Sequence, residues 1–505
     1  MERYDKLFIG GDLSGIQKYL YNISSHKAAV SLKGRSAYLS DVMEDICDDI
    51  KETAVKAGAL KAESIYCSGG KFYVTVEATD NMVAIMGALD KRIKAIKEAM
   101  WNEQLGQLGI NIGYVAFSEN ADGSVNVEGQ DYVNCGELWR IVNALFFIQK
   151  NQKFRDILAE QYNCFFEPIP LEGHPRVCAV TGIESAACTP LYNDKPIDGN
   201  DNFYVLPIVK EQIERGKELC AADGFKDFGS YATGTELGIL RMDVDGLGKR
   251  FIKGFASIED YRSYSDCLTD FFEKGIKDLQ KRDEFKPHLN IVYAGGDDLF
   301  IVGRWDKVID FAELIHKETE KAPFNHNVAD NDRVHISGGI AVVKSTFPIA
   351  KAAELAGEAE EYAKQFGNGE KNAFHMLGKT VSWARPVPGT RLAEFDYVKG
   401  YKDKFVKLVT QYALSKSLLH KIMLYSSMAD ENKMKKNEDA RNYSYIWHLS
   451  YYLTRFAKRY ESSIKICELC YDLRDNELKD GRKLELIALA ARWAELILKD
   501  ELNNN

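Results

Sequence analysis

The chain has 505 residues, of which 45% are hydrophobic, and a formal net charge of −9 at pH 7. This length suffices for about three or four domains, and the acidic balance argues against a protein that grips nucleic acid over its whole surface. The sequence has no apolar run of about 18 residues and no secretory pattern, so we expect a cytoplasmic protein without a membrane partner. The ten cysteines show no disulfide-like spacing.

The first part of the chain begins with an apolar strand at residues 7–9, which runs towards Asp12-Leu13-Ser14-Gly15. A glycine-rich motif, Ser68-Gly69-Gly70-Lys71-Phe72, follows further on. Residues 131–161 read as a helix with an aromatic and aliphatic stripe. Residues 162–230 contain several prolines and are predicted to be rich in loops.

A second strand of apolar residues, 237–242, ends in Asp243-Val244-Asp245-Gly246, and a helical pattern begins near Lys249. Alternate positions of an extended segment point the same way, so Asp243 and Asp245 are predicted to face one site.

The most informative motif is Gly295-Gly296-Asp297-Asp298, which lies between two short apolar runs rich in β-formers. This pattern predicts a hairpin whose glycines permit positive φ and whose tip carries two adjacent carboxylates. Adjacent carboxylates repel each other and need a cation, and Mg²⁺ or Mn²⁺ prefers such oxygen ligands. Taken alone, the motif also fits a solvated turn, because Gly and Asp are ordinary turn residues.

A strand, an acidic turn, a helix and an acidic hairpin are the organisation of nucleotidyl-transfer palms and nucleotide cyclases. In those enzymes two cations about 3.5–4 Å apart activate the attacking hydroxyl and steady the departing pyrophosphate. The later motifs therefore predict a site for metal-bound triphosphate.

The chain also contains an internal repeat. The segment from Asp12 aligns with the segment from Asp243, and Gly69-Gly70-Lys71-Phe72 aligns with Gly295-Gly296-Asp297-Asp298. In this alignment Lys71 and Phe72 replace the paired carboxylates. A lysine cannot coordinate Mg²⁺, although it can neutralise phosphate as a point charge. We expect the first copy to form a wall of the nucleotide cleft and the second to hold the metal.

The fold class predicted from these patterns is α+β, with two ferredoxin-like palm/cyclase domains, the first degenerate. Helical periodicity dominates after about residue 391. The predicted domains are a degenerate first palm with a trailing helix at 1–160, an inter-palm domain at 161–230, the catalytic palm at 231–390 and a helical C-terminal domain at 391–505.

Several segments carry a resemblance to a known family. They are GDLSGIQ, KGRSAYL, LGILRMDVDGLG, YAGGDDLFIVG, ISGGIAVVKSTFPI and the tryptophan at 383. In this order they resemble the large subunit of CRISPR type III effector complexes, and the Csm-type (III-A) branch is the closer match. The resemblance covers most of the chain.

The resemblance implies a nucleotidyltransferase that is activated by target RNA and makes cyclic oligoadenylates from ATP, as a subunit of a complex with other effector subunits, a CRISPR guide RNA and target RNA. It implies Mg²⁺ or Mn²⁺ ligands at Asp243, Asp297 and Asp298, which are also the expected catalytic residues. The expected nucleotide-binding residues are Gly295, Gly296, Ser265, Asp245, Gly69, Gly70 and Lys364. Ser265 matches the family serine near the adenine, and an ordinary solvated helical serine is the alternative. Lys364 is placed near the triphosphate, with a surface lysine as the alternative.

The chain departs from the family pattern in two respects. None of the nine histidines is followed by Asp, so we expect no HD-type DNase activity in this chain. The inter-palm segment of the family commonly carries a four-cysteine zinc site, whereas here Thr181 stands where a CxxC pair would have its second cysteine. The four cysteines available are Cys164, Cys178, Cys188 and Cys220, and zinc is not expected.

Two other functions compete with this interpretation. A stand-alone GGDEF-like or class III-like cyclase would make a different nucleotide signal, but it leaves the degenerate first copy and the helical tail unexplained. A non-catalytic scaffold of a ribonucleoprotein would not need four aspartates in one copy, because unpaired acids at a turn cost stability when nothing binds them.

Overall fold

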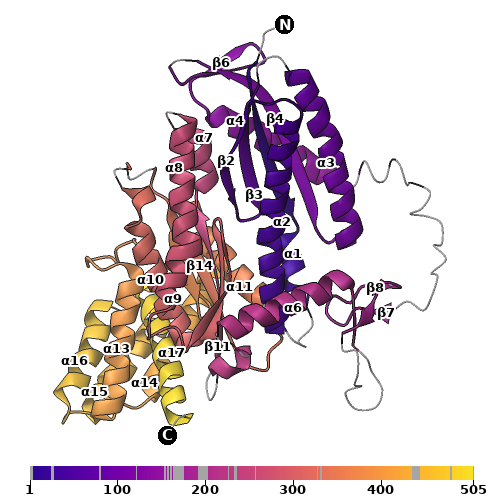
Figure 1. Cartoon of the computed structure of the whole chain (residues 1–505). Helices are drawn as coiled ribbons and strands as arrows, with labels where there is room; N and C mark the ends of the chain where they lie inside the picture. Colours follow the sequence, from indigo (N-terminus) through magenta and orange to yellow (C-terminus); the bar gives the residue numbers. More distant parts are fainter. Residues whose placement is uncertain are drawn as a thin grey trace.

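The computed structural model describes residues 4–503 except 24–27, 79–80, 121, 153–154, 156–158, 160–161, 163–175, 192–202, 224, 226, 233–235, 256, 327, 330–331, 435–443 and 478–479. Two six-stranded sheets, two small two-stranded sheets and many helices make up these residues (Figure 1). This mixture of helices and strands agrees with the coarse fold class predicted from the sequence. No helix in the described part of the chain combines the length and apolar character needed to cross a bilayer.

The first sheet has the strand order β2-β3-β1-β4-β5-β6. Its central strand β1 is almost wholly buried, since helices cover both faces. Phe8 lies against Trp139 of α4, with ring centroids 4.4 Å apart, while Leu7 and Ile9 belong to the core on the side of α2 and α3. The elements of this half are β1 (Lys6–Ser14), α1 (Ile16–Tyr21), α2 (Ala28–Lys56), β2 (Lys61–Ser68), β3 (Lys71–Glu77), α3 (Met82–Gln104), β4 (Gly109–Glu119), β5 (Val125–Val127), β6 (Gln130–Tyr132) and α4 (Gly136–Asn151).

The second sheet has the order β12-β13-β11-β14-β15-β16, and its first four strands repeat the order of the first sheet. The alanine-rich α11 packs against β11 and β14, and α10 contacts the same two strands. The elements are β11 (Leu237–Asp245), α7 (Leu247–Lys253), α8 (Ile258–Thr269), the π-helical η3 (Asp270–Gly275), α9 (Ile276–Gln280), β12 (Leu289–Gly295), β13 (Asp298–Arg304), α10 (Trp305–Glu320), η4 (Pro323–Asn325), β14 (His335–Val343), α11 (Ile349–Lys364), α12 (Phe366–Gly369), β15 (Ala373–Met376) and β16 (Lys379–Ser382).

The segment between the halves is less loop-rich than predicted. Pro207 begins a helix instead of breaking one, because the first helical position needs no backbone N–H donor. This helix, α6, crosses α2 so closely that a Cβ on Gly34 would lie 1.7 Å from the Gln212 carbonyl oxygen. The elements here are β7 (Arg176–Val177), β8 (Glu184–Ser185), β9 (Thr189–Pro190), β10 (Tyr204–Val205), α6 (Pro207–Ala222) and η2 (Phe228–Ala232).

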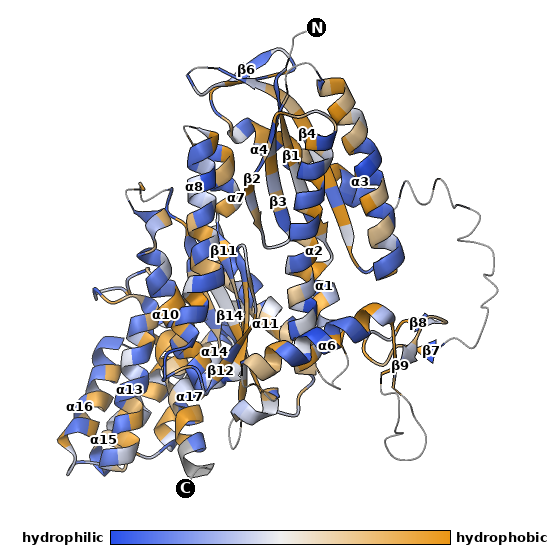
Figure 2. Cartoon of the chain, viewed as in Figure 1, coloured by the Kyte–Doolittle hydropathy of each residue, from blue (hydrophilic) through white to orange (hydrophobic). Residues whose placement is uncertain are grey.

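The remaining helices form a bundle beside the second sheet (Figure 1). Hydrophobic and hydrophilic bands alternate along them, as in α3 (Figure 2), which is how amphipathic helices bury one face. Trp305 at the start of α10 donates a hydrogen bond from Nε1 to Asp500 Oδ2 at 2.7 Å and so ties the bundle to the sheet. The helices are α13 (Glu394–Tyr412), α14 (Ser417–Met434), α15 (Ser444–Arg459), α16 (Ile464–Asp472), η7 (Leu473–Glu477) and α17 (Gly481–Asn503).

Candidate active site at the acidic hairpin

The predicted acidic hairpin is present at the end of β12 and β13. Gly295 pairs with Asp298, and Gly296 and Asp297 form the connecting turn. Of the two glycines, only Gly296 has a positive φ, 65°. The Val244 N–H donates to the Asp297 carbonyl oxygen at 3.1 Å and fixes the turn against the end of β11.

The turn brings three carboxylates together. Asp243 of β11 is the register partner of Asp298 of β13, and Asp297 lies at the tip. One oxygen from each of these residues lies within 4.8 Å of the other two, a grouping that no other three His, Cys, Asp or Glu side chains form within the described residues. Burial, followed by the charges of Asp243 and Asp297, raises the pKa of Asp298 to about 8.

This donor set fits a divalent cation of the Mg²⁺ or Mn²⁺ type. All the available ligand atoms are carboxylate oxygens, which suit hard cations. Burial and then the charges of Asp243 and Asp297 disfavour the ionised form of Asp298 and so raise its pKa, and a bound cation would favour the ionised form. The structure thus brings together the three residues predicted as metal ligands.

Asp245 lies on the same strand face as Asp243 but outside this group. Its Oδ2 accepts hydrogen bonds from Ser337 Oγ at 2.5 Å and from the Asn372 N–H at 3.0 Å, and Lys371 Nζ lies 3.8 Å from its Oδ1. The expectation that Asp243 and Asp245 act on one site is therefore only partly met. The spacing of two residues fixes the face, but the neighbouring strand and loop decide where the carboxylate points.

Lys364 lies beside the acidic group and is not a solvated surface lysine, while its predicted contact with a triphosphate stays a prediction. Its Nζ is 2.8 Å from Asp243 Oδ2 and 2.6 Å from Glu360 Oε1. Glu360 is 3% exposed and also pairs with Arg241 Nε at 3.1 Å. Sequence reasoning missed Glu360 and Arg241. The spacing of four residues between Glu360 and Lys364 on one helix was the available signal.

The predicted nucleotide-binding glycines also allow the two halves of the chain to pack closely against each other. The hairpin tips of the two halves contact each other, so that a Cβ on Gly69 would lie 2.8 Å from Gly296 Cα. The Gly296 N–H donates to Ser68 Oγ at 2.9 Å, and Ser68 donates in turn to Glu273 Oε1 at 2.6 Å. Gly70 has φ of 77° in the first tip. Contact of these glycines with phosphate stays a prediction.

Ser265 is a buried residue of α8, not a solvated one. It is 1% exposed, and its Oγ has no hydrogen-bond partner among the described residues. The unpartnered hydroxyl is compatible with a ligand contact, while its proximity to an adenine stays a prediction.

Strand pairing corrects the alignment of the two halves by one residue. Asp12 pairs with Lys71 as Asp243 pairs with Asp298. The Leu13 N–H donates to the Gly70 carbonyl oxygen as the Val244 N–H donates to that of Asp297. Gly70 and Lys71, not Lys71 and Phe72, therefore replace the paired aspartates. The sequence alignment slipped because both motifs contain a Gly-Gly pair.

The inter-palm cysteines are all buried where they are described. Cys178 is 1%, Cys188 8% and Cys220 4% exposed, and Cys164 lies outside the described residues. Burial, and then the charge of Cys178, raises the pKa of the Cys188 thiol. Among the described residues they belong to no metal-ligand group.

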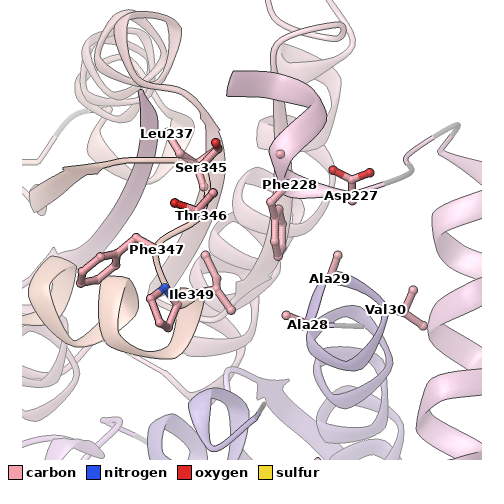
Figure 3. A pocket seen from close by; sticks show the side chains of 12 residues that line it. Ala28, Ala29, Val30, Asp227, Phe228, Leu237, Ser345, Thr346, Phe347 and Ile349 are labelled. Carbon is pink, nitrogen blue, oxygen red and sulfur yellow. The ribbon is translucent and has the colours of Figure 1, made fainter. Parts of the chain in front are cut away.

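A cavity of about 480 Å³ lies away from the aspartates. It is open to solvent and is lined by the start of α2, by η2 and by the turn that precedes α11, with Phe228 and Ile349 on its walls (Figure 3). The turn follows the far end of β14, whereas the aspartates lie near its beginning. No residue predicted for the site lines this cavity.

The raised pKa of Asp298 gives a testable pH dependence. A cation requires the carboxylate, and the carboxyl group is mostly protonated below a pKa of about 8. Binding therefore releases a proton, and we expect the apparent affinity for Mn²⁺ to rise about tenfold per pH unit up to about pH 8 and then to level off. Calorimetric titration with Mn²⁺ at several pH values measures this. Asp298→Asn should weaken the dependence without removing it, because burial also raises the pKa of Asp297. A flat profile in the unsubstituted chain would contradict it.

Comparisons with known proteins agree with this geometry. A family model described as the Cas10/Cmr2 second palm domain matches residues 236–375, and one described as Csm1 subunit domain B matches residues 6–168. Together they span more than half of the chain.

A curated relative covers nearly the whole chain. The CRISPR system single-strand-specific deoxyribonuclease Cas10/Csm1 (subtype III-A) of Enterococcus italicus is 25% identical over 517 residues, which are 89% of this chain and 62% of that protein. The chain thus spans about three fifths of the length of this relative.

Solved structures share the fold. A Csm1–Csm4 cassette in complex with cA4 superposes with a TM-score of 0.62 at 18% identity, over 97% of this chain and 70% of that chain. A Csm1–Csm4 cassette in complex with one ATP superposes with a TM-score of 0.60 at 18% identity, over 96% of this chain and 70% of that chain. The resemblance found in the sequence is confirmed: the chain belongs to the Cas10/Csm1 family, the large subunits of subtype III-A CRISPR systems.

Proposed function

We propose that this chain synthesises cyclic oligoadenylates from ATP by 3′–5′ adenylyl transfer in its second half, when target RNA engages the assembled effector complex. The observation that carries the proposal is the convergence of Asp243, Asp297 and Asp298 within 4.8 Å, with Lys364 2.8 Å from Asp243. Three acids with a lysine beside them provide both a place for cations and a positive charge for phosphate.

In the proposed mechanism, Asp243, Asp297 and Asp298 hold the divalent ions. When bound, such ions lower the pKa of an attacking hydroxyl and neutralise charge on the phosphates and on the departing pyrophosphate. Glu360 and Asp243 hold the Lys364 ammonium beside the same site. Asp245, fixed by Ser337 and Asn372, orients the end of β11. No side chain is required as a dedicated base.

We also infer that both sheets are ferredoxin-like palms with the domain boundaries predicted from the sequence, at 160, 230 and 390. The order β12-β13-β11-β14, with helices between the strands, supports this inference, and the first sheet repeats it.

The same proposal includes the partners. The solved relatives are Csm1–Csm4 cassettes, including complexes with ATP and cA4, and a subunit of the Csm4 type is the first expected neighbour here, followed by guide RNA and target RNA. A stand-alone cyclase fits less well, because the family match extends through both halves. The lack of HD-type DNase activity stays a prediction.

Mass spectrometry of reaction products tests the function directly. We expect the complex assembled with this chain, given ATP, Mg²⁺ and a matching target RNA, to release cyclic adenylates, and to release none with an unmatched RNA. Linear or mononucleotide products alone would indicate another nucleotidyl-transfer reaction, and unchanged ATP would favour the scaffold.

A further inference from the structure

Cys47 and Cys67 are two free thiols of the first half, and the proposed function uses neither of them. Cys47 lies within α2 and is buried, whereas Cys67 is half-buried near the end of β2. α2 packs against β2 and β3. The two thiols therefore belong to the same helix–strand interface.

A β-bulge in β2 turns Cys67 towards α2. In a regular strand, residues three positions apart point to opposite faces, so Ser64 and Cys67 would lie on different sides of the sheet. The pairing of β2 with β3 shifts by one residue between Ser64 and Tyr66, and such a bulge re-aims the side chains that follow it. As a result, both Ser64 and Cys67 contact α2.

The contacts of the two sulfur atoms bring them to one place. Cys67 Sγ lies 3.7 Å from its acceptor, the Met43 carbonyl oxygen, and in the helix this carbonyl also accepts the N–H of Cys47, four residues further along. Cys47 Sγ lies 3.4 Å from Ser64 Oγ. When Cys47 is ionised, a hydrogen bond from Cys67, with another from Ser64 and the charge of Lys51, outweighs burial and lowers the pKa of Cys47 to about 7. The pair is thus partly ionised at neutral pH, and the thiolate is the reactive form of cysteine.

Cys67 also lines a small cavity beside the first hairpin tip. The cavity has a volume of about 20 Å³ and lies between Met43 and Glu44 of α2 and the tip residues 67–70. A space of this size holds about one water molecule. Among cellular oxidants, hydrogen peroxide is close to water in size, so it suits this cavity better than a bulky disulfide does.

We propose that Cys47 and Cys67 form a reversible disulfide on exposure to hydrogen peroxide, and that this bond weakens the hold of Ser68 on the acidic hairpin. First, the Cys67 sulfur bonds to a peroxide oxygen, the O–O bond breaks, and the Cys67 proton leaves with the hydroxide as water. The Cys47 sulfur then displaces the hydroxyl group of the Cys67 sulfenic acid, and the Cys47 proton leaves with that hydroxyl as a second water. The two electrons lost by the thiols reduce one peroxide to two waters. A thiol reductant reverses the bond.

The bond reaches the acidic hairpin through Ser68, which directly follows Cys67. Ser68 Oγ accepts the Gly296 N–H at 2.9 Å and donates to Glu273 Oε1 at 2.6 Å. In the disulfide, Cys67 has no proton for the Met43 carbonyl oxygen, and its sulfur must approach the Cys47 sulfur to about 2 Å. Ser68 moves with Cys67, so the Gly296 N–H loses a well-placed acceptor.

The experiment exposes the reduced full-length chain to hydrogen peroxide, blocks the remaining thiols and identifies the peptides by mass spectrometry. We expect a peptide that joins Cys47 to Cys67, lighter by two hydrogen atoms than its two parts, and its loss after treatment with dithiothreitol. Amide hydrogen exchange at Gly296 should be about two- to tenfold faster in the oxidised chain, which corresponds to the loss of one hydrogen bond. Dithiothreitol should restore the slower exchange.

Cys267→Ser is the matched control, because Cys267 is an exposed cysteine of α8. It should keep both the cross-link and the change in exchange, whereas Cys47→Ser and Cys67→Ser should each abolish both. If one of these two variants does not fold, the other gives the same comparison. Absence of the cross-link in the oxidised, folded chain would overturn the proposal, and so would a cross-link that leaves exchange at Gly296 unchanged. Neither measurement requires nucleotide synthesis, so either failure would leave the proposed function standing.

Discussion

Replacing Asp297 and Asp298 together by alanine should abolish cyclic adenylate synthesis while the chain still folds and assembles. These residues provide two of the three carboxylates that lie within 4.8 Å of one another. Changes to residues that only orient metal ligands already cost about 10–100-fold in metal affinity or activity, so loss of two ligands should reduce product by more than about a hundredfold. Quantitative mass spectrometry of the products from the assembled complex measures this.

The same substitution has an expected effect on stability that separates metal loss from misfolding. Burial and the charge of Asp243 raise the pKa values of Asp297 and Asp298, so their ionisation opposes folding when no cation is bound. The folded pKa lies above the unfolded one, and this penalty therefore grows as the pH rises above about 4. Near pH 8 and without Mg²⁺, we expect the double variant to melt at a higher temperature than the unsubstituted chain. Added Mg²⁺ should stabilise only the unsubstituted chain.

Two outcomes would reject the assignment of the acidic site. Undiminished product from the double variant would show that the chemistry occurs elsewhere. Equal stabilisation of both proteins by Mg²⁺ would show that the ion binds at another place. Asp283→Ala is a suitable control, because it removes an acid from the loop before β12 that is not part of the three-aspartate group.

Gly296→Ala should damage the site without altering any of its acids. Gly296 has φ of 65°, and a Cβ there would lie 2.6 Å from Tyr66 Oη and 2.7 Å from Gly69 Cα. A left-handed conformation costs a non-glycine residue about 1–2 kcal/mol, and overpacking costs about 1–3 kcal/mol more. Because Asp297 and Asp298 follow directly, relief of this clash must shift them. A displacement of about 1 Å can lower a rate about a hundredfold.

Gly378→Ala is the matched control for Gly296→Ala. Gly378 lies in the turn between β15 and β16 with φ of 84°, but nothing lies within 4 Å of a Cβ placed there. In both variants an alanine must adopt a positive φ, which costs free energy. Only in Gly296→Ala does the added Cβ also clash with neighbouring atoms. We expect a further fall in melting temperature of several degrees and a loss of product in Gly296→Ala alone. Equal behaviour of the two variants would mean that the contact between the hairpin tips does not position the aspartates.

Much of the site could be predicted from the sequence because its signals are local. The Gly-Gly pair between two apolar runs predicted the hairpin of β12 and β13. The alternation of side chains along a strand predicted that Asp243 and Asp245 lie on one face. The prediction of a loop-rich segment was wrong around Pro207, and the reason is equally local. A proline is tolerated in the first turn of a helix, so its presence alone did not indicate a loop.

The amino-acid sequence by itself determined the family, the internal repeat and the three carboxylates that converge. Only the tertiary structure decided which residues of the first half stand opposite those of the second. A slip of one residue between two Gly-Gly motifs changes little in a sequence alignment, whereas paired strands fix each residue to one partner and one face. The contacts of Gly69 and Ser68 with Gly296 join positions more than two hundred residues apart. Such contacts depend on how two folded halves pack, which no local pattern encodes.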